Sequence, residues 1–411
     1  MTVRASWGMF YDLPHTLFFY AYSTAPPWGY RIQLTNPAGG FADPWKDYPG
    51  GDPFPTRLTS DIKFPAGGVF ATNNFDLKTT YLEQWNLTVQ KQIGQNWLAS
   101  ASYLGNNSIH LWTNTDINAA AYLGTGPCTI NAIPYTTCST TANTQQRRRL
   151  SLQKPSEGQY YAQLPQLDDG GTGTYNAMLL SVQHRLTRGL TLSSNYTWSH
   201  CISDLVTSEF RNNLYQDPTN RAYDRSNCTG TDRRHLFNFS TVVSTPTFSN
   251  QWAQKVAGNW RLSPIFRTQS GPFLSITSGV DTALNGIAGQ RVDQLVAQPK
   301  AENPTLDQFF VPNAFAQPAN GKFGNMGAAN IQGRGSFQFD FALSRDFPIR
   351  EGQRLEFRAE AYSLLNHPIL GQPNQTMVNV PTNINFNTTN FGKTTFSTGE
   401  RIMQFALKYQ F

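Results

Sequence analysis

The chain has 411 residues, of which 14% are charged and 13% are aromatic, and its formal net charge is +6. The aromatic content excludes a disordered chain, and the sequence has no apolar run of the ~20 residues that a helical membrane protein needs. The charged fraction is also well below the ~25% of an ordinary soluble protein, so the composition favours a β-rich protein with mostly uncharged polar residues.

The chain opens on a strand pattern rather than on an export signal. Met1 is followed at once by Thr2-Val3-Arg4 and by alternating residues over 3–11. A signal peptide would show a basic start and an apolar stretch. We therefore expect either a cytoplasmic protein or a sequence whose natural start is missing, and the cysteines described below favour the missing start.

Runs of about ten residues with alternating apolar and polar side chains recur along the chain, as in β-strands. The clearest pair is 175–187 and 190–199, where Met178, Leu180 and Val182 share one face. Further strands are expected at 85–93, 97–105, 235–244, 259–270, 272–277, 337–347, 355–362 and 401–411. The pattern predicts roughly ten to twelve strands and no helix of ordinary length.

The connections between the expected strands alternate in length. Short turns are expected at 94–96, 188–189 and 350–352. Long loops rich in Pro, Gly and Asn are expected at about 24–80, 106–174, 202–234, 279–335 and 366–399. A soluble sandwich keeps most loops short, whereas a bacterial outer-membrane barrel has short periplasmic turns and long outer loops.

The two faces of the expected strands differ in an unusual way. One face is apolar, and the other carries Asn, Thr, Ser and Gln with few charges, which suits a wide barrel with a wet interior and a lipid-facing outside. Aromatic residues near strand ends would then form belts at the membrane interfaces, namely Trp85, Trp97, Tyr103, Tyr196, Trp198 and Tyr409. In the alternative, a soluble sandwich, they are core residues.

The four cysteines fall into two local pairs within loop-like sequence. Cys128 and Cys138 flank a Pro/Thr-rich stretch, and Cys201 and Cys228 flank a polar one. Neither pair has the Cys-x₂-Cys spacing typical of zinc sites. Two disulfides in an oxidising compartment are the favoured interpretation, and four unrelated free thiols are the alternative.

Charged residues cluster at three places. The triplet 147–149 is expected to be a solvated loop cluster, with phosphate contact as the alternative. The segment 232–235 (DRRH) is expected where a strand re-enters the membrane, at lipid headgroups or paired with neighbouring loops. Glu356, Arg358 and Glu360 alternate onto one strand face, where we expect paired lumen charges rather than catalytic carboxylates.

No motif in the sequence indicates an enzyme. The six histidines are scattered without metal-ligand spacing, and nucleophile-elbow, phosphate-loop and dinucleotide motifs are missing. The Gly-rich stretch 321–335 lacks the Lys-Ser/Thr ending of a phosphate cradle and is interpreted as a flexible loop. We therefore expect no catalysis, no cofactor, no metal site and no nucleic-acid partner.

The C-terminus carries a pattern of its own. Phe405, Leu407, Tyr409 and Phe411 alternate with other residues, and the chain ends on the last of them. A terminal strand that ends in an aromatic residue resembles the signal that outer-membrane barrels present to their assembly machinery. The pattern agrees with the alternation seen elsewhere in the chain.

Several segments together resemble one family, the Oar-like barrels of TonB-dependent outer-membrane transporters. The matching segments are 4–12 (RASWGMFYD), 81–87 (YLEQWNL), 103–105 (YLG), 175–177 (YNA), 196–199 (YTWS), 232–235 (DRRH), 269–273 (QSGPF), 357–361 (FRAEA), 365–368 (LNHP), 391–392 (FG) and the aromatic end. Their order and spread cover essentially the whole chain.

The resemblance implies an all-β fold, an antiparallel transmembrane barrel of which residues 1–411 form roughly the C-terminal half. Complete members have about 22 strands, a plug that contacts TonB, and a small N-terminal domain. The implied partners are outer-membrane lipid, the barrel-assembly machinery, TonB through the missing plug, and an unknown ligand such as a siderophore, saccharide or peptide.

The expected function is therefore energy-coupled uptake of a scarce ligand across the outer membrane. The alternative is a soluble or surface-attached all-β binding protein or adhesin. Such a protein would use exposed loop aromatics, for example Trp28, Trp45 and Trp112.

Overall fold

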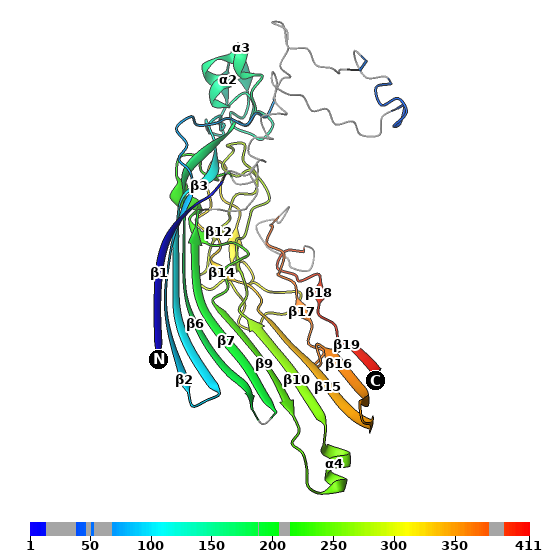
Figure 1. Cartoon of the computed structure of the whole chain (residues 1–411). Helices are drawn as coiled ribbons and strands as arrows, with labels where there is room; N and C mark the ends of the chain where they lie inside the picture. The colour runs from blue at the N-terminus through cyan, green and yellow to red at the C-terminus, as the bar shows by residue number, and fades with distance from the viewer. Residues whose placement is uncertain (14–37, 47–50, 53–67, 188, 205–213, 378–389) are drawn as a thin grey trace.

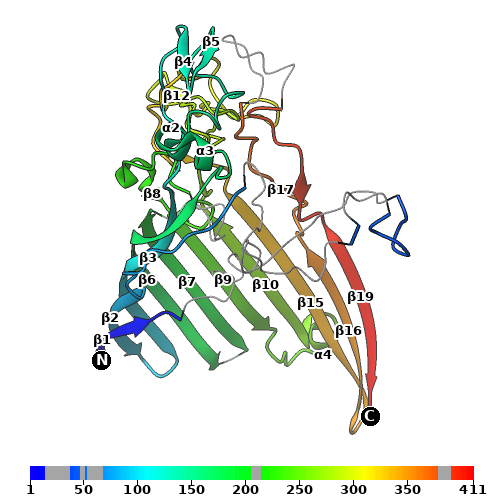
Figure 2. The ribbon, with the colours of Figure 1, turned by 90° about the horizontal axis from the view of Figure 1, so that it is seen from above.

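The computed structural model describes residues 1–13, 38–46, 51–52, 68–187, 189–204, 214–377 and 390–411. Its main feature is one open antiparallel sheet of eleven strands, with the two chain ends at opposite edges (Figures 1 and 2). The strands follow the order β1 (Thr2–Tyr11), β2 (Tyr81–Ile93), β3 (Trp97–Asp116), β6 (Pro165–Thr187), β7 (Leu190–Ser203), β9 (His235–Ser244), β10 (Trp260–Gln269), β15 (Ser336–Arg350), β16 (Gln353–Tyr362) and β19 (Ile402–Gln410), and β8 (Ser226–Asn227) pairs with β7. The main sheet thus has the ten to twelve strands expected from the sequence.

Each main strand pairs with its neighbours in chain order, so the connections alternate between two ends of the sheet. The short turns at 94–96 and 351–352, the adjoining ends of β6 and β7, and the connection 245–259 lie at one end, here called the turn end. The described residues of the long connections lie at the opposite end, here called the loop end (Figure 1). This is the arrangement expected from the alternating loop lengths.

Two strands are longer than expected. β3 continues to Asp116 and β6 begins at Pro165, so 106–116 and 165–174 belong to the sheet rather than to a long loop. These segments are rich in Asn, Gly and Thr and show no apolar alternation, yet backbone pairing holds them together. The register shifts between Ile109 and Thr113, as in a β-bulge. Pairing without an apolar face suits strand ends that rise out of a membrane.

The helices of the described residues are short. They are α2 (Arg149–Gln153), α3 (Pro155–Gly158), α4 (Gln251–Ala257) and the 3₁₀ turn η1 (Arg221–Asp224). α4 lies at the turn end, where the Asn250 side chain accepts hydrogen bonds from the N–H groups of Trp252 and Ala253 and so caps it. None of the described helices is long and apolar enough to cross a membrane.

The long connections fold together into a compact layer at the loop end, here called the loop assembly: the described residues of 117–164, 214–234, 270–335, 363–377 and 390–401. It contains the short pairs β4 (Cys128–Ile130) with β5 (Ile133–Tyr135), β11 (Phe273–Leu274) with β14 (Ile331–Gln332), β12 (Asp293–Gln294) with β13 (Phe315–Ala316), and β17 (Ile369–Leu370) with β18 (Ser397–Thr398). The strand expected at 272–277 is only the two residues of β11.

A hydrophobic core lies in the loop assembly and not in the sheet. Its members are Leu274, Ile276, Val292, Phe309, Phe310, Ala314, Phe315, Met326, Ile331, Met377 and Phe391. The interpretation of 321–335 as a loose loop is therefore wrong, because Met326, Ala329 and Ile331 are buried. Gly324 permits this packing, since a Cβ there would lie 2.3 Å from the carbonyl oxygens of Arg291 and Val292.

Candidate functional site

The register of the sheet sorts its side chains into two faces, here called the apolar face and the polar face. On β6, Leu180 lies between Ala101 of β3 and Tyr196 of β7 on the apolar face. The adjacent Ser181 lies between Ser100 and Asn195 on the polar face. The same alternation continues through the paired strands to β19. The sheet therefore separates an apolar surface from a hydrophilic one, as a barrel wall between lipid and water requires.

The aromatic residues expected at the membrane interfaces all lie on the apolar face. Trp97 and Tyr409 are near the turn end, and Trp198 pairs with His235 toward the loop end. The Trp85 ring covers Gly105 so closely that a Cβ on Gly105 would lie 2.3 Å from it. Four of the six side chains, those of Trp97, Tyr103, Trp198 and Tyr409, are exposed in this structure, on the surface that lipid would cover.

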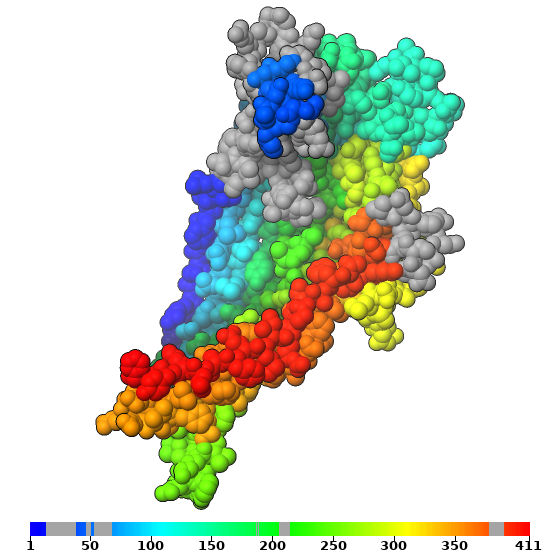
Figure 3. All heavy atoms as spheres, turned by 90° about the vertical axis from the view of Figure 1, so that its right-hand side faces the viewer, coloured from blue at the N-terminus to red at the C-terminus, as the bar shows by residue number. Residues whose placement is uncertain are grey.

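The three charges expected in the lumen share the polar face of β16. Glu356 pairs in register with Asp346 of β15 and Lys408 of β19, and Arg358 forms an ion pair with Glu360. The Arg358 side chain is about half exposed. The three residues therefore lie together on the hydrophilic surface of the sheet, on the strand next to the edge strand β19. Figure 3 shows β19, in red, along this edge of the molecule.

The C-terminal strand β19 pairs with β16 and leaves its other edge open in the described structure. Phe405, Leu407 and Tyr409 face the apolar side, opposite Ala359, Phe357 and Leu355. Phe411 is 94% exposed. The ring of Phe411 contacts the ring of Tyr409, with the two centroids 5.8 Å apart.

Arginine–carboxylate pairs tie the loop assembly together at several points. The most buried pair is Arg291–Asp224, whose nitrogen and oxygen atoms lie 2.6 Å apart with side chains 2% and 0% exposed. Arg291 also donates to the backbone oxygens of Tyr223 and Met326, and its guanidinium lies 3.8 Å from the centroid of the Tyr223 ring. Arg291 thus joins the 214–234 segment to the 270–335 segment.

The arginine triplet 147–149 is not a solvated cluster, and that expectation is wrong for two of its three members. Arg147 is fully buried and Arg148 is 6% exposed. The Arg147 guanidinium donates to Asn143 Oδ1 and to the backbone oxygens of Ala121, Thr140 and Leu284. Arg148 pairs with Asp116 at 3.3 Å. Both side chains are part of the packing that fastens 117–164 onto its neighbours.

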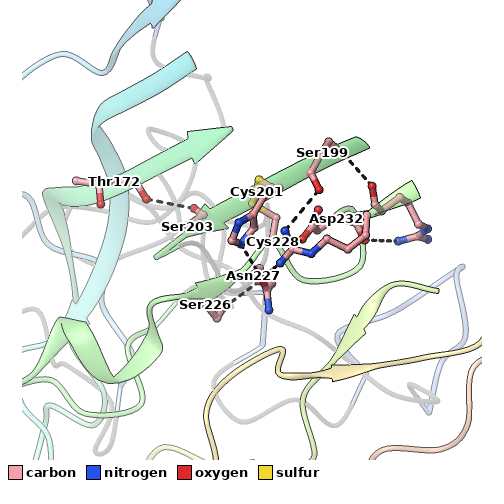
Figure 4. Close-up of a disulfide and its surroundings, with 11 residues drawn as sticks. Thr172, Ser199, Cys201, Ser203, Ser226, Asn227, Cys228 and Asp232 are labelled. Atoms are coloured by element: carbon pink, nitrogen blue, oxygen red, sulfur yellow. Dashed lines mark hydrogen bonds and ion pairs between the residues drawn. A yellow bond between two sulfur atoms is a disulfide. The ribbon is translucent and has the colours of Figure 1, made fainter. Parts of the chain in front are cut away.

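The structure joins the cysteines in two disulfides, Cys128–Cys138 and Cys201–Cys228, with Cα–Cα distances of 5.2 and 5.3 Å. The first closes the β4–β5 hairpin within the loop assembly. The second links the loop end of β7 to the residue after β8 (Figure 4). Both therefore constrain the outer part of the molecule.

Asp232, beside the second disulfide, is a buried acid in the loop that leads into β9 (Figure 4). Its nearest cation is Arg234, 3.6 Å away, and Arg234 also donates to Asn227 and lies over the Phe273 ring of a neighbouring loop. Burial raises the pKa of the Asp232 carboxyl, and Arg234 and His200 offset only part of this effect. The segment 232–235 therefore pairs within the loops.

We expect Asp232→Asn to keep or increase stability at pH 7. Because the pKa of Asp232 is higher in the folded protein than in the unfolded chain, its ionised form destabilises the fold once the pH exceeds both values. The variant should therefore gain stability over the wild type as pH rises from about 3 to neutrality. Guanidinium unfolding at several pH values measures this difference. A variant whose stability falls further below that of the wild type as the pH rises would contradict the prediction.

A polar cavity lies where β3 and β6 enter the loop assembly. It has a volume of about 520 Å³, and its lining includes Asn74, Thr115, Asp168, Asn220 and Arg221. Arg221 forms an ion pair with Asp168, which raises the pKa of the arginine through their hydrogen bonds. The cavity offers amide, hydroxyl and charged groups to a polar ligand. This cavity could not be predicted from the sequence, because its residues come from four separate segments.

Groups that could hold a metal ion are not found in the described part of the chain, where no three His, Cys, Asp or Glu side chains converge. Of the loop tryptophans considered for a binding protein, Trp28 lies outside the described residues. Trp112 donates a hydrogen bond to the backbone oxygen of Lys78.

Comparison with known proteins identifies a family. The model of a family described as "outer membrane beta barrel domain" matches residues 1–404. No curated protein matches the chain.

Solved structures similar to the chain include three transporters. The outer membrane transporter YddB from Escherichia coli is 11% identical, with a TM-score of 0.40 over 83% of this chain and 34% of that one. The copper transporter OprC is 8% identical and the FrpB iron transporter from Neisseria meningitidis is 10% identical, each with a TM-score of 0.35 over 83% of this chain and 33% of the other. The chain thus spans about a third of the length of these structures.

Proposed function

Since the chain belongs to the outer membrane beta-barrel domain family and hence to the bacterial outer membrane, we propose that it forms the C-terminal part of the barrel of a TonB-dependent transporter. Such a transporter takes up a scarce ligand with energy delivered by the TonB complex through a plug. The further partners are outer-membrane lipid and the barrel-assembly machinery.

The observation that carries this proposal is the hydrophilic face of the sheet beneath a packed loop assembly. A wall with polar residues on one side suits a barrel wide enough to hold water and a plug. Glu356, Arg358 and Glu360 then face the lumen, where their alternating charges can contact plug residues. The loop assembly captures the ligand, and the polar face guides it inward.

The lining of the polar cavity near Arg221 suits a hydrophilic ligand. Its lining of amides and hydroxyls, with one acid–arginine pair, can hydrogen-bond the many polar groups of a siderophore, saccharide or peptide. An apolar ligand would leave these groups without partners, which is costly.

Uptake in cells tests the proposal. Labelled ferrichrome, maltoheptaose and trialanine serve as probes of the three ligand classes, in cells with and without the gene and with and without TonB. We expect one probe to accumulate only when both are present, and Arg221→Gln to lower its uptake. The neighbouring Arg225→Gln is the control, because Arg225 does not line the cavity. Gene-dependent uptake that persists without TonB would contradict the proposal, as would no dependence on the gene for any probe.

The soluble alternative is not favoured, because the family match covers residues 1–404 and places the chain in the outer membrane. A surface-attached adhesin would bind its partner at the cell surface with no accumulation inside the cell. The same uptake assay therefore separates adhesion from transport.

Replacing Phe411 with Ser is expected to lower the amount of protein in the outer membrane several-fold while leaving the stability of the assembled protein unchanged. The terminal ring is 94% exposed, so we expect it to contribute little to stability, and we propose that it acts in assembly. Immunoblots of outer-membrane and periplasmic fractions measure the effect. Phe75→Ser, another fully exposed phenylalanine, is the control. Equal outer-membrane levels for both variants would show that Phe411 is no assembly signal.

A further inference from the structure

A second cavity lies at the loop end of β15, where the loop assembly meets the sheet. It has a volume of about 260 Å³, and its lining includes Lys300, Phe309, Arg334, Phe337, His367 and Leu370. The lining thus combines cationic and aromatic side chains, in contrast to the polar cavity described above. It is called the rim pocket below.

Two cations share one aromatic ring in the rim pocket. Lys300 Nζ lies 5.3 Å and Arg334 Cζ 4.9 Å from the centroid of Phe309, whose side chain is fully buried. Arg334 is held in place by hydrogen bonds from its guanidinium to Thr394 Oγ1 and to the backbone oxygen of Thr305. Its position is therefore fixed by the loop assembly.

Neither cation has an acidic partner among the described residues, where the seven ion pairs involve other side chains. Burial lowers the pKa of Lys300, and the nearby Arg334 lowers it further. Burial also lowers the pKa of Arg334. The two cations are thus partly desolvated without a counterion, which is unfavourable in free energy. An anion bound in the pocket would offset this cost.

The rim pocket is continuous with the apolar face of the sheet. Phe337 belongs to that face, and its ring contacts His367 at 5.2 Å and Phe266 at 5.4 Å between centroids. Phe266 in turn contacts Phe237 at 5.9 Å. A row of rings therefore leads from the pocket across β15, β10 and β9 on the apolar face of the sheet.

We propose that the rim pocket binds the phosphate group of a lipid headgroup in the outer leaflet, with the acyl chains lying along Phe337, Phe266 and Phe237. Arginine and lysine together recognise phosphate through charge-assisted hydrogen bonds. The loop end is the outer end of the barrel, so the pocket stands at headgroup level. A free phosphate ion would contact only the cations, whereas a lipid would contact the cations with its headgroup and the row of rings with its acyl chains.

Native mass spectrometry tests this on protein extracted in detergent from the outer membrane of expressing cells. The probes are palmitoyl-oleoyl phosphatidic acid, phosphatidylcholine with the same chains, and inorganic phosphate. We expect phosphatidic acid to bind more tightly than phosphatidylcholine. Lys300→Met, which keeps an unbranched apolar side chain over Phe309, should weaken phosphatidic acid binding about fivefold to tenfold. Lys300→Arg should retain it.

The matched control is Lys322→Met, which removes an exposed lysine from the same connection without touching the pocket. Lys300→Met should melt at the same temperature as the wild type or higher, because it removes a partly buried charge that has no acidic partner among the described residues. Equal phosphatidic acid binding by Lys300→Met and wild type would overturn the proposal. Displacement of phosphatidic acid by an equal concentration of inorganic phosphate would assign the pocket to a free anion and overturn the lipid assignment.

Discussion

Arg291→Met should destabilise the loop assembly by about 3–5 kcal/mol, because it leaves the buried Asp224 carboxylate without its cation. Asp224 is fully buried, and burial already raises its pKa while Arg291 opposes the shift. The variant also loses the hydrogen bonds to Tyr223 and Met326 that join two loop segments. Limited proteolysis of outer-membrane vesicles should cut the loops faster in the variant.

Two further variants make that test specific. Arg225→Met breaks a pair with Asp204 whose arginine side chain is 41% exposed, and should cost less than about 1 kcal/mol. The double variant Asp224→Leu/Arg291→Met removes both charges and should recover part of the loss. Equal proteolysis rates for Arg291→Met and Arg225→Met would contradict the structural role of the buried pair.

Leu180→Arg should lower the free energy of unfolding in lipid vesicles by about 2–4 kcal/mol, whereas Ser181→Arg should change it little. The two residues are neighbours on β6 but lie on opposite faces. An arginine at position 180 would enter the hydrocarbon, and one at position 181 would enter water. Guanidinium titration followed by tryptophan fluorescence measures the difference.

A substitution at another depth in the membrane provides the control for this comparison. Leu190→Arg places the charge on the first residue of β7, at the turn end, where the cost near the membrane interface falls to about 0–1 kcal/mol. A soluble β-sandwich core would penalise Leu180→Arg without that dependence on depth. Equal costs at 180 and 181 would contradict the assignment of the faces.

The sheet could be predicted from sequence because its strands and short turns are determined by residues that are close together in the chain. Alternation with a period of two sets the face of each side chain, and the turns at 94–96 and 188–189 stand between clear strands. The ends of β3 and β6 escaped prediction, because above the membrane backbone pairing needs no apolar pattern. α4 could have been predicted from its capping residues, because Asn250 precedes a run of helix-forming residues and Gly258 follows it.

The loop assembly could not be predicted, because its contacts join residues far apart in the chain. Arg291 and Asp224 are separated by 67 positions, and Arg147 and Leu284 by 137. No periodic pattern marks such pairs, so a run of arginines looked solvated and a glycine-rich stretch looked loose. The apolar residues 309, 310 and 315 were the available hint that the longest loop has a core.

The most direct test of this account is spin-label accessibility along β6 in outer-membrane vesicles. All four natural cysteines are in disulfides, so single cysteines placed at 177–182 can be labelled selectively. We expect oxygen accessibility to peak at 178, 180 and 182, and accessibility to a water-soluble nickel reagent to peak at 177, 179 and 181. Six labels that are all equally accessible to the nickel reagent would show that neither face of the sheet meets lipid, and the barrel account would be wrong.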